Sequence, residues 1–306
     1  MSRTDDARPR RRSELTNVTR KELSESWESP HHGYHRNAVL HDPVRQRILD
    51  AAAVMPPGAV VGGWAAAYLH GATHLDGRDE PVLLLLPADR VVKRPGIQIS
   101  RVALDPVDVT TKQGISCSTG TRAGFDLLRL APDLTEAVTA GDCVVRTGLT
   151  TQAGLLSYAA EHPRRRGLRQ LRAALPLVNP AAASPPESRL RMLCGQRAGL
   201  PGLLVNVPLY GATGDFLGIP DLLEPVTGLV IEYDGEQHRD LDQHTADNLR
   251  EESFEGAGLV VVRVTSLDLK DAEATSSRIA DTYRRRLSHH RPADGWTVGW
   301  RPKRAA

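Results

Sequence analysis

Three carboxylates and a histidine stand close together in one short stretch of the sequence. Asp221 lies within an apolar run, and Glu232, Asp234 and His238 end or follow the next one. If the two runs are antiparallel strands joined by a turn near Val226, Asp221 lies roughly across from Glu232. Asp234 shares a face with Glu232, because side chains alternate along a strand. Carboxylates that close repel one another unless a hard divalent cation such as Mg²⁺ neutralises them. The spacing predicts a metal site, and solvated acidic strand ends are the alternative.

The segments around these residues predict a strand, a helix and a further strand. Apolar, β-prone runs cover residues 217–223 and 229–233, a helical pattern covers 243–257, and another apolar run covers 259–265. A strand-helix-strand crossover makes the last strand parallel to the strand that carries Glu232. The carboxyl end of a central strand is the usual location of a site in an open α/β sheet.

The order of these residues matches a known pattern, namely Pro220-Asp221, ten intervening residues, Glu232-x-Asp234-Gly235 and Gln237-His238. It resembles the PD-(D/E)xK restriction-endonuclease-like superfamily, and more closely an uncharacterised domain family related to very-short-patch-repair endonucleases. The resemblance covers residues 182–290 and implies a mixed-sheet α/β domain that hydrolyses nucleic acid with Mg²⁺ or Mn²⁺. The superfamily usually has Lys two residues after the Glu, where this chain has Asp234.

The resemblance implies metal ligands. Asp221 and Glu232 are expected to hold the ion, with Asp234 as a further ligand. An acidic residue on the first helix of the domain approaches the metal in the superfamily, so Glu187 is a fourth candidate. Ser184-Pro-Pro-Glu187 is also a capping-box signature, which leaves a purely structural role open for Glu187.

Three other residues are candidates for catalysis or for binding the substrate. Because histidine titrates near neutral pH, His238 is expected to act as general acid or base. The alternative is that it orients Asp234 from outside the ligand set. Gln237 or Arg250 is expected to contact the nucleic-acid phosphate in place of the missing Lys.

Composition bounds the class of protein. At 306 residues the chain is long enough for two domains, and 40% hydrophobic with 25% charged residues is typical of soluble globular proteins. No apolar stretch is long enough to span a bilayer. The three cysteines have no paired spacing, which argues against zinc and disulfide frameworks and favours a reduced cytoplasm.

The charge of the chain is unevenly distributed. Residues 215–256 contain twelve Asp or Glu and two Arg, a balance of −10, so the remainder of this +2 chain carries +12. That asymmetry is compatible with a metal site facing phosphate.

The N-terminal half has a different resemblance. Residues 1–14 are expected to be a disordered basic tail, and residues 15–178 to form an α/β region ending in a Pro- and Ala-rich linker. The motifs "LHGA", "GTRAGFDLLRL" and "AVTAGDCVVRTG" resemble AbiEi-like antitoxins of type IV toxin–antitoxin systems over residues 40–160. The segment from 15 to 38 resembles a shortened winged-helix unit, and 291–306 is expected to be a basic tail.

Local patterns predict the remaining elements. Helices are expected over 42–54, 59–70, 122–130, 134–147, 152–161 and 274–288, strands over 82–86 and 97–104, and a turn over 266–269.

Two functions remain open from the sequence. The first is a Mg²⁺-dependent nucleic-acid phosphodiesterase, endonuclease-like, acting on DNA in repair or in defence against phage or plasmids. The second is a non-catalytic, antitoxin-like regulator that binds DNA. The expected partner is nucleic acid, with DNA favoured over RNA, and not a membrane. A toxin partner and self-association are both left open.

Overall fold

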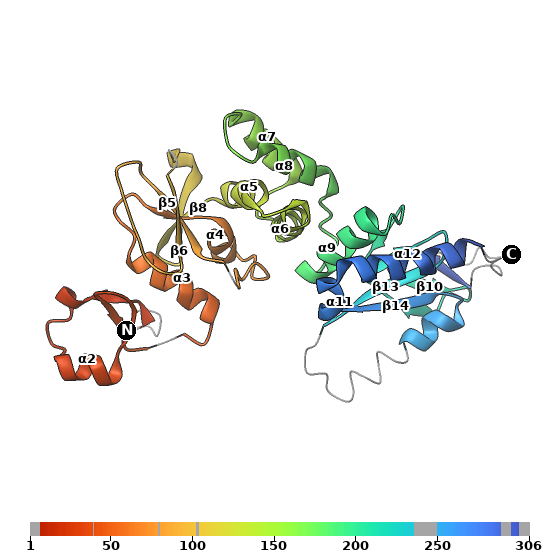
Figure 1. The fold of residues 1–306 in the computed structure, drawn as a ribbon, viewed down its shortest axis with the longest axis horizontal. Coiled ribbons are helices and arrows are strands. Elements are labelled where there is room, and N and C mark those ends of the chain that lie inside the picture. Colours follow the sequence, from red (N-terminus) through yellow and green to blue (C-terminus); the bar gives the residue numbers. More distant parts are fainter. Residues whose placement is uncertain are drawn as a thin grey trace. The chain divides into compact units, whose positions relative to one another are not determined.

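The computed structural model describes residues 7–38, 40–78, 80–101, 104–235, 250–288 and 295–299. It is mixed α/β and divides into two units, Met1–Val178 and Asn179–Ala306 (Figure 1). The division falls in the Pro- and Ala-rich segment in which the sequence analysis places the domain boundary. Among the described residues, no helix has the length and apolar character needed to cross a membrane.

Unit 1 begins with a small three-stranded sheet of order β1-β3-β2. Its elements are β1 (Arg10–Arg11), η1 (Arg12–Glu14), α2 (Arg20–Ser26), β2 (Glu28–His31) and β3 (Tyr34–Arg36). The prediction of a disordered tail over residues 1–14 is therefore wrong for 10–14. The Arg11 guanidinium donates to the Tyr34 hydroxyl at 2.8 Å and lies over its ring, and these contacts tie the basic segment to β3.

The second sheet of unit 1 has the order β6-β5-β4-β8-β7. Its strands are β4 (Val60–Val61), β5 (Val82–Leu86), β6 (Ile97–Arg101), β7 (Val109–Lys112) and β8 (Ile115–Ser118). The predicted strand over 82–86 is confirmed, and every residue of it is buried. The sequence analysis missed the β7–β8 hairpin. Its turn residues Gln113 and Gly114 both have positive φ, +53° and +74°, as a two-residue type I′ turn requires.

Helices complete unit 1: α3 (Pro43–Ala53), α4 (Gly63–Leu69), α5 (Gly120–Leu130), α6 (Leu134–Arg146), α7 (Gln152–Glu161), α8 (Leu168–Ala174) and the 3-10 turns η2 (Pro106–Asp108) and η3 (Leu175–Leu177). The helices predicted from 42, 122, 134 and 152 are confirmed. The helix predicted over 59–70 starts only at Gly63, because Val60 and Val61 pair with β5 as strand β4. Side chains cap several of these helices; Asp42, for example, accepts from the Arg45 amide at 2.9 Å.

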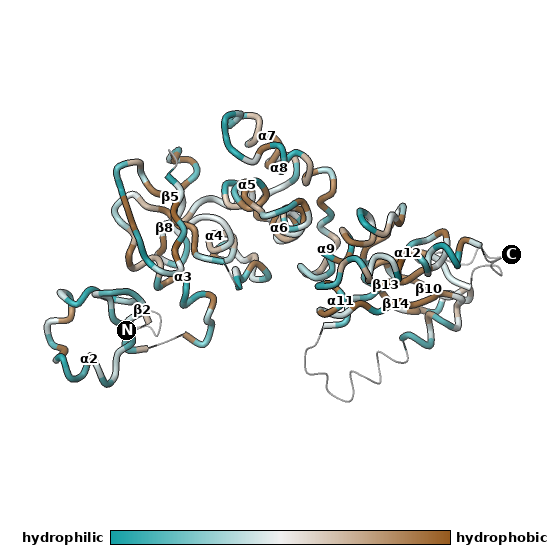
Figure 2. Tube along the Cα trace, in the orientation of Figure 1, coloured by the Kyte–Doolittle hydropathy of each residue, from teal (hydrophilic) through white to brown (hydrophobic). Residues whose placement is uncertain are grey.

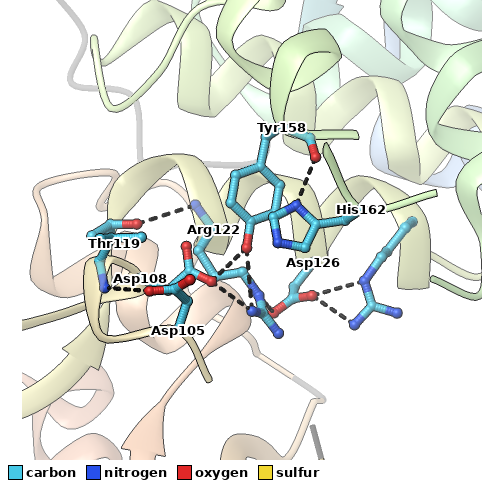
Figure 3. Close-up of polar contacts among 9 residues, drawn as sticks. Asp105, Asp108, Thr119, Arg122, Asp126, Tyr158 and His162 are labelled. Carbon is cyan, nitrogen blue, oxygen red and sulfur yellow. Dashed lines mark hydrogen bonds and ion pairs between the residues drawn. The ribbon is translucent and has the colours of Figure 1, made fainter. Parts of the chain in front are cut away.

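A buried network of charges joins η2, α5 and α7 in unit 1 (Figure 3). Arg122, 1% exposed, donates to Asp108 at 3.0 Å and to Asp126 at 2.9 Å. Asp126 also accepts from the Arg129 Nε at 2.8 Å, and the Tyr158 hydroxyl donates to Asp108 at 2.5 Å. Each buried charge thus has a partner of opposite sign, which is the condition under which proteins tolerate such burial.

Unit 2 is built on a four-stranded mixed sheet of order β14-β13-β12-β9. The strands are β9 (Leu204–Val205), β12 (Leu222–Glu224), β13 (Leu229–Asp234) and β14 (Val260–Thr265). β12 is antiparallel to β13, and β14 is parallel to β13, as predicted. Figure 2 shows β13 and β14 as strongly hydrophobic, and the first four residues of β13 are buried. A sheet covered on both faces has this continuous apolar pattern.

One face of this sheet packs on helices α9 (Pro185–Met192), η4 (Leu193–Arg197), α11 (Ser266–Lys270) and α12 (Ala272–Ser288). Ile231, Leu190 and Ile279 belong to its core. The other face has a separate core that includes Val230 and Phe254. Each side of β13 is therefore buried, and its side chains alternate between two cores.

A second small sheet in unit 2 has the order β11-β10-β15, with β10 (Leu209–Gly211), β11 (Phe216–Gly218) and β15 (Trp296–Val298). The predicted basic tail over 291–306 is wrong for residues 296–298, which pair with β10 and bury Trp296. The predicted turn over 266–269 is the helix α11, because Thr265 and Asp268 form a capping box. The strand predicted over 217–223 is interrupted, so that β11 ends at Gly218 and β12 begins at Leu222.

Candidate active site

The turn between β12 and β13 fixes how the two strands pair. Glu224 is fully buried, and its carboxylate accepts from the Thr227 amide at 2.7 Å and from the Val226 amide at 3.1 Å. With the turn held, Glu224 pairs with Leu229 and Leu222 pairs with Ile231. A carboxylate within the turn therefore sets the register that the site requires.

This register leaves Asp221 beside the end of β13. Its Oδ2 accepts the Tyr233 amide at 2.7 Å. Burial raises the pKa of Asp221 to about 6, the Tyr233 hydrogen bond opposes the rise, Glu187 and Glu232 add to it, and Arg250 lowers it. Asp221 thus lies within electrostatic reach of two other carboxylates, as the sequence analysis predicts for Glu232.

Glu232 is 8% exposed and is paired with Arg250, whose Nη2 lies 3.3 Å from Oε2. Arg250 belongs to a helical segment, 250–256, that packs against the sheet through Phe254. Gly218, with φ +147°, lets this segment approach, since a Cβ there would lie 2.9 Å from the Phe254 ring and 3.1 Å from the Arg250 side chain. We expected the Arg250 guanidinium to contact nucleic-acid phosphate. In this structure it is paired with the Glu232 carboxylate.

Glu187 helps to cap the N-terminus of α9, although its carboxylate accepts from the amide of Ala183, one residue before the Ser184 N-cap, and so departs from the standard capping box. Its Oε1 accepts from the Ser184 hydroxyl at 2.8 Å, and its Oε2 accepts from the Ala183 amide at 2.7 Å. The Ser184 hydroxyl in turn accepts from the Glu187 amide at 3.4 Å. Glu187 nevertheless lies close enough to raise the pKa of Asp221. The residue is therefore part of the acidic group, with both carboxylate oxygens engaged in hydrogen bonds.

Asn206 connects the Glu187 carboxylate to the backbone of Asp221, and the sequence analysis did not identify it. Its Nδ2 donates to Glu187 Oε2 at 2.9 Å and to the Ala181 carbonyl at 2.8 Å, and its amide donates to the Asp221 carbonyl at 3.1 Å. The residue has φ +49°, a left-handed conformation in which Asn is enriched. A lone Asn shortly before Pro208 is the only signal in the sequence, and it is a weak one.

The other predicted site residues lie at or beyond the end of β13. Asp234 is the last residue of the strand, half-exposed, and pairs with Thr265 of β14. By strand alternation it shares the Glu232 face. Gln237 and His238 lie outside the described residues.

The described residues contain no group of three or more His, Cys, Asp or Glu side chains arranged to hold a metal ion. The structure brings Asp221 and Glu232 together as a pair, with Glu187 nearby. Carboxylate oxygens are the donors that Mg²⁺ and Mn²⁺ take, and the raised pKa of Asp221 marks a position where a cation would relieve electrostatic strain. The pair fits a hard divalent cation, provided that Arg250 releases Glu232.

Comparisons with protein-family models, with curated proteins and with solved structures found no match for this chain. The family resemblances therefore rest on the sequence motifs alone.

Proposed function

We propose that unit 2 is a nucleic-acid phosphodiesterase, endonuclease-like, that depends on Mg²⁺ or Mn²⁺ and acts on DNA. The observation that carries this proposal is the placement of Asp221, directly before β12, beside Glu232 near the carboxyl end of β13, in a buried setting that raises the pKa of Asp221. The mixed sheet with parallel β13 and β14, and α9 packed against it, supports a restriction-endonuclease-like fold.

The chain's own groups have distinct parts in this proposal. Asp221 and Glu232 supply the ligand oxygens, and the Tyr233 amide holds the Asp221 carboxylate in place. A divalent cation bound there would supply charge stabilisation to the scissile phosphate and a bound water of lowered pKa. Arg250, paired with Glu232 in this structure, would contact a phosphate oxygen in place of the missing Lys if Glu232 held a cation. His238 is the proposed proton-transfer group, and Gln237 a phosphate contact.

The proposal is tested by incubating the full chain with single-stranded, duplex and mismatched DNA in Mg²⁺ or Mn²⁺. Cleavage by the wild type that Asp221→Asn lowers on the order of a hundredfold or more supports it. Asp215→Asn is the matched control, because Asp215 is an exposed carboxylate between β10 and β11. Equal cleavage by the wild type and Asp221→Asn would assign the activity to another site or a contaminant.

Cation binding has a readout that does not need activity. Since a cation that binds only the folded state stabilises it, millimolar Mg²⁺ or Mn²⁺ should raise the melting temperature of the wild type and not of Asp221→Asn. A melting curve unchanged by either ion in the wild type would contradict the metal site.

A second candidate function is favoured by a different observation. Arg250 already occupies the position beside Glu232, and Asp234 stands where the superfamily has Lys. Both features suit a non-catalytic domain in an antitoxin-like DNA-binding regulator. Asp234→Lys discriminates between the two: it should create or raise cleavage if position 234 is a degenerate Lys slot, and abolish cleavage if Asp234 serves a working site. If both the wild type and Asp234→Lys bind DNA and neither cleaves it, the non-catalytic regulator is favoured.

The same regulator would make unit 1 an AbiEi-like region. The segment with α2 and the β1-β3-β2 sheet is compatible with the shortened winged-helix unit proposed for it, since one helix precedes a two-stranded hairpin. If the protein is such a regulator, its partner would be DNA, and a toxin would be a further partner.

A further inference from the structure

The connection between α7 and α8 in unit 1 concentrates positive charge. Five arginines lie within residues 164–172, and residues 162–174 contain no Asp or Glu. We call this group the arginine surface; it consists of Arg164, Arg165, Arg166, Arg169 and Arg172. All are exposed except Arg165, which is half-exposed. On α8 the buried residues are Leu168, Leu171 and Ala174, so Arg169 and Arg172 lie on the opposite, solvent-facing side.

Most of these charges are not offset by acids. Within the described part of the chain, no acidic side chain pairs with Arg164, Arg166, Arg169 or Arg172. Arginines on α12 show the contrast, since Arg284 lies 2.9 Å from Asp281. Five like charges on one turn and one short helix repel one another, and a polyanion would relieve that repulsion.

The backbone under the arginine surface is held firmly by the charge network of Figure 3. Arg129, bound to Asp126, donates its Nη1 to the Arg166 carbonyl at 3.2 Å. Gly167 has φ +85°, and a Cβ there would lie 2.0 Å from the Arg129 carbonyl oxygen. Only glycine permits this approach, so the turn rests directly on the end of α5.

A second attachment holds α8 itself. The Gln170 side-chain amide donates to the Leu128 carbonyl at 3.1 Å and to the Ala131 carbonyl at 2.7 Å. The arginine surface is therefore presented on a fixed backbone, and less conformational entropy is lost when a ligand binds to it.

We propose that the arginine surface binds the sugar-phosphate backbone of a nucleic acid. Guanidinium groups make charge-assisted, often bidentate, hydrogen bonds to phosphate, and phosphate contacts position a protein without reading sequence. Binding at this surface requires neither a metal ion nor the carboxylates of unit 2. It holds whether unit 2 cleaves DNA or not.

The test measures binding of the full chain to a fluorescein-labelled duplex of arbitrary sequence by anisotropy, in EDTA and over a series of salt concentrations. The variant is Arg169→Ala with Arg172→Ala, which removes two charges from the solvent side of α8. Because each phosphate contact contributes about −0.9 to the slope of log affinity against log salt, loss of two contacts should make that slope less negative by about 1.8. We expect affinity to fall about tenfold or more at low salt. Arg169→Lys with Arg172→Lys, which keeps the charge, should keep most of the slope.

Arg90→Ala with Lys93→Ala is the matched control, since it removes two exposed charges from the β5–β6 connection. It should bind as the wild type does, and circular dichroism melting should show all variants folded. Wild-type affinity and slope in the Arg169/Arg172 alanine variant would overturn the proposal. So would equal binding of labelled polyglutamate that depends on the same arginines, because it would assign the surface to an acidic protein. Binding that persists in Asp221→Asn without cleavage separates this proposal from the function of unit 2.

Discussion

Replacement of Asp221 by Asn should stabilise the β12–β13 hairpin at pH 7.5 and have little effect near pH 4. The folded pKa of Asp221, about 6, lies above the ordinary value of 3.8. Folding therefore favours the protonated form, so the contribution of this carboxyl is fully present below pH 3.8 and is lost as pH rises through 6. The difference between the two pKa values corresponds to about 3 kcal/mol. Asn keeps an acceptor for the Tyr233 amide and carries no charge, so it avoids that loss.

Hydrogen exchange of the β13 amides measures this effect in the full chain, because strand amides report local and global opening. In EDTA, the protection of Asp221→Asn relative to wild type should rise from about equal near pH 4 to about a hundredfold at pH 7.5. Comparing the two proteins at each pH cancels the intrinsic pH dependence of exchange. Asp215→Asn should show no such trend. Lower protection of Asp221→Asn at pH 7.5, or a ratio that does not change with pH, would refute the electrostatic account of Asp221.

Three further substitutions test other contacts. Arg250→Ala removes the guanidinium that competes for Glu232, so calorimetric titration should show Mn²⁺ binding several-fold tighter; weaker binding would mean that Arg250 supports the site. Asn206→Ala should lower the free energy of unfolding by about 1–3 kcal/mol in urea titrations, through lost hydrogen bonds and a strained φ. Asn206→Gly, which relieves the strain, should cost less, and equal losses would refute the strain component. Arg122→Met leaves Asp108 buried without its cation and Asp126 with Arg129 alone, and it should cost about 3–5 kcal/mol by thermal melting; a loss below about 1 kcal/mol would mean that the network is not a stabilising one.

The sheet of unit 2 was predictable because its information is local. Apolar runs of strand length on either side of Pro225 and Gly228 predict the hairpin, and the crossover rule predicts that β14 is parallel to β13. The proximity of Asp221 and Glu232 follows from that register alone. The start of the helix at Asp42 was equally clear, since Asp42 places a side-chain acceptor directly before Pro43.

What the sequence did not predict depends on contacts between distant segments. β15 is three residues long and exists because it pairs with β10, far away in the chain. The ion pair of Arg250 with Glu232 depends on how closely a helix packs on the sheet, which Gly218 decides. Asn206 carries no motif and owes its role to a positive φ. No pattern in the local sequence encodes any of these three.

The Glu224 turn has a consequence for how unit 2 assembles. β12 and β13 are joined by four residues, whereas Leu229 of β13 must find Val260 of β14 much later in the chain. Because closing a short loop is fast and costs little entropy, we expect the hairpin to form early in folding and the parallel pairing to follow. Thr227→Ala, which removes the hydrogen bond that the Thr227 hydroxyl donates to the Glu224 carboxylate, should then slow refolding with a high φ-value, and an effect confined to the unfolding rate would contradict this order. The acidic pair would thus come together while water still screens its charges, and the cost of burying Asp221 would arise only when the helices dock.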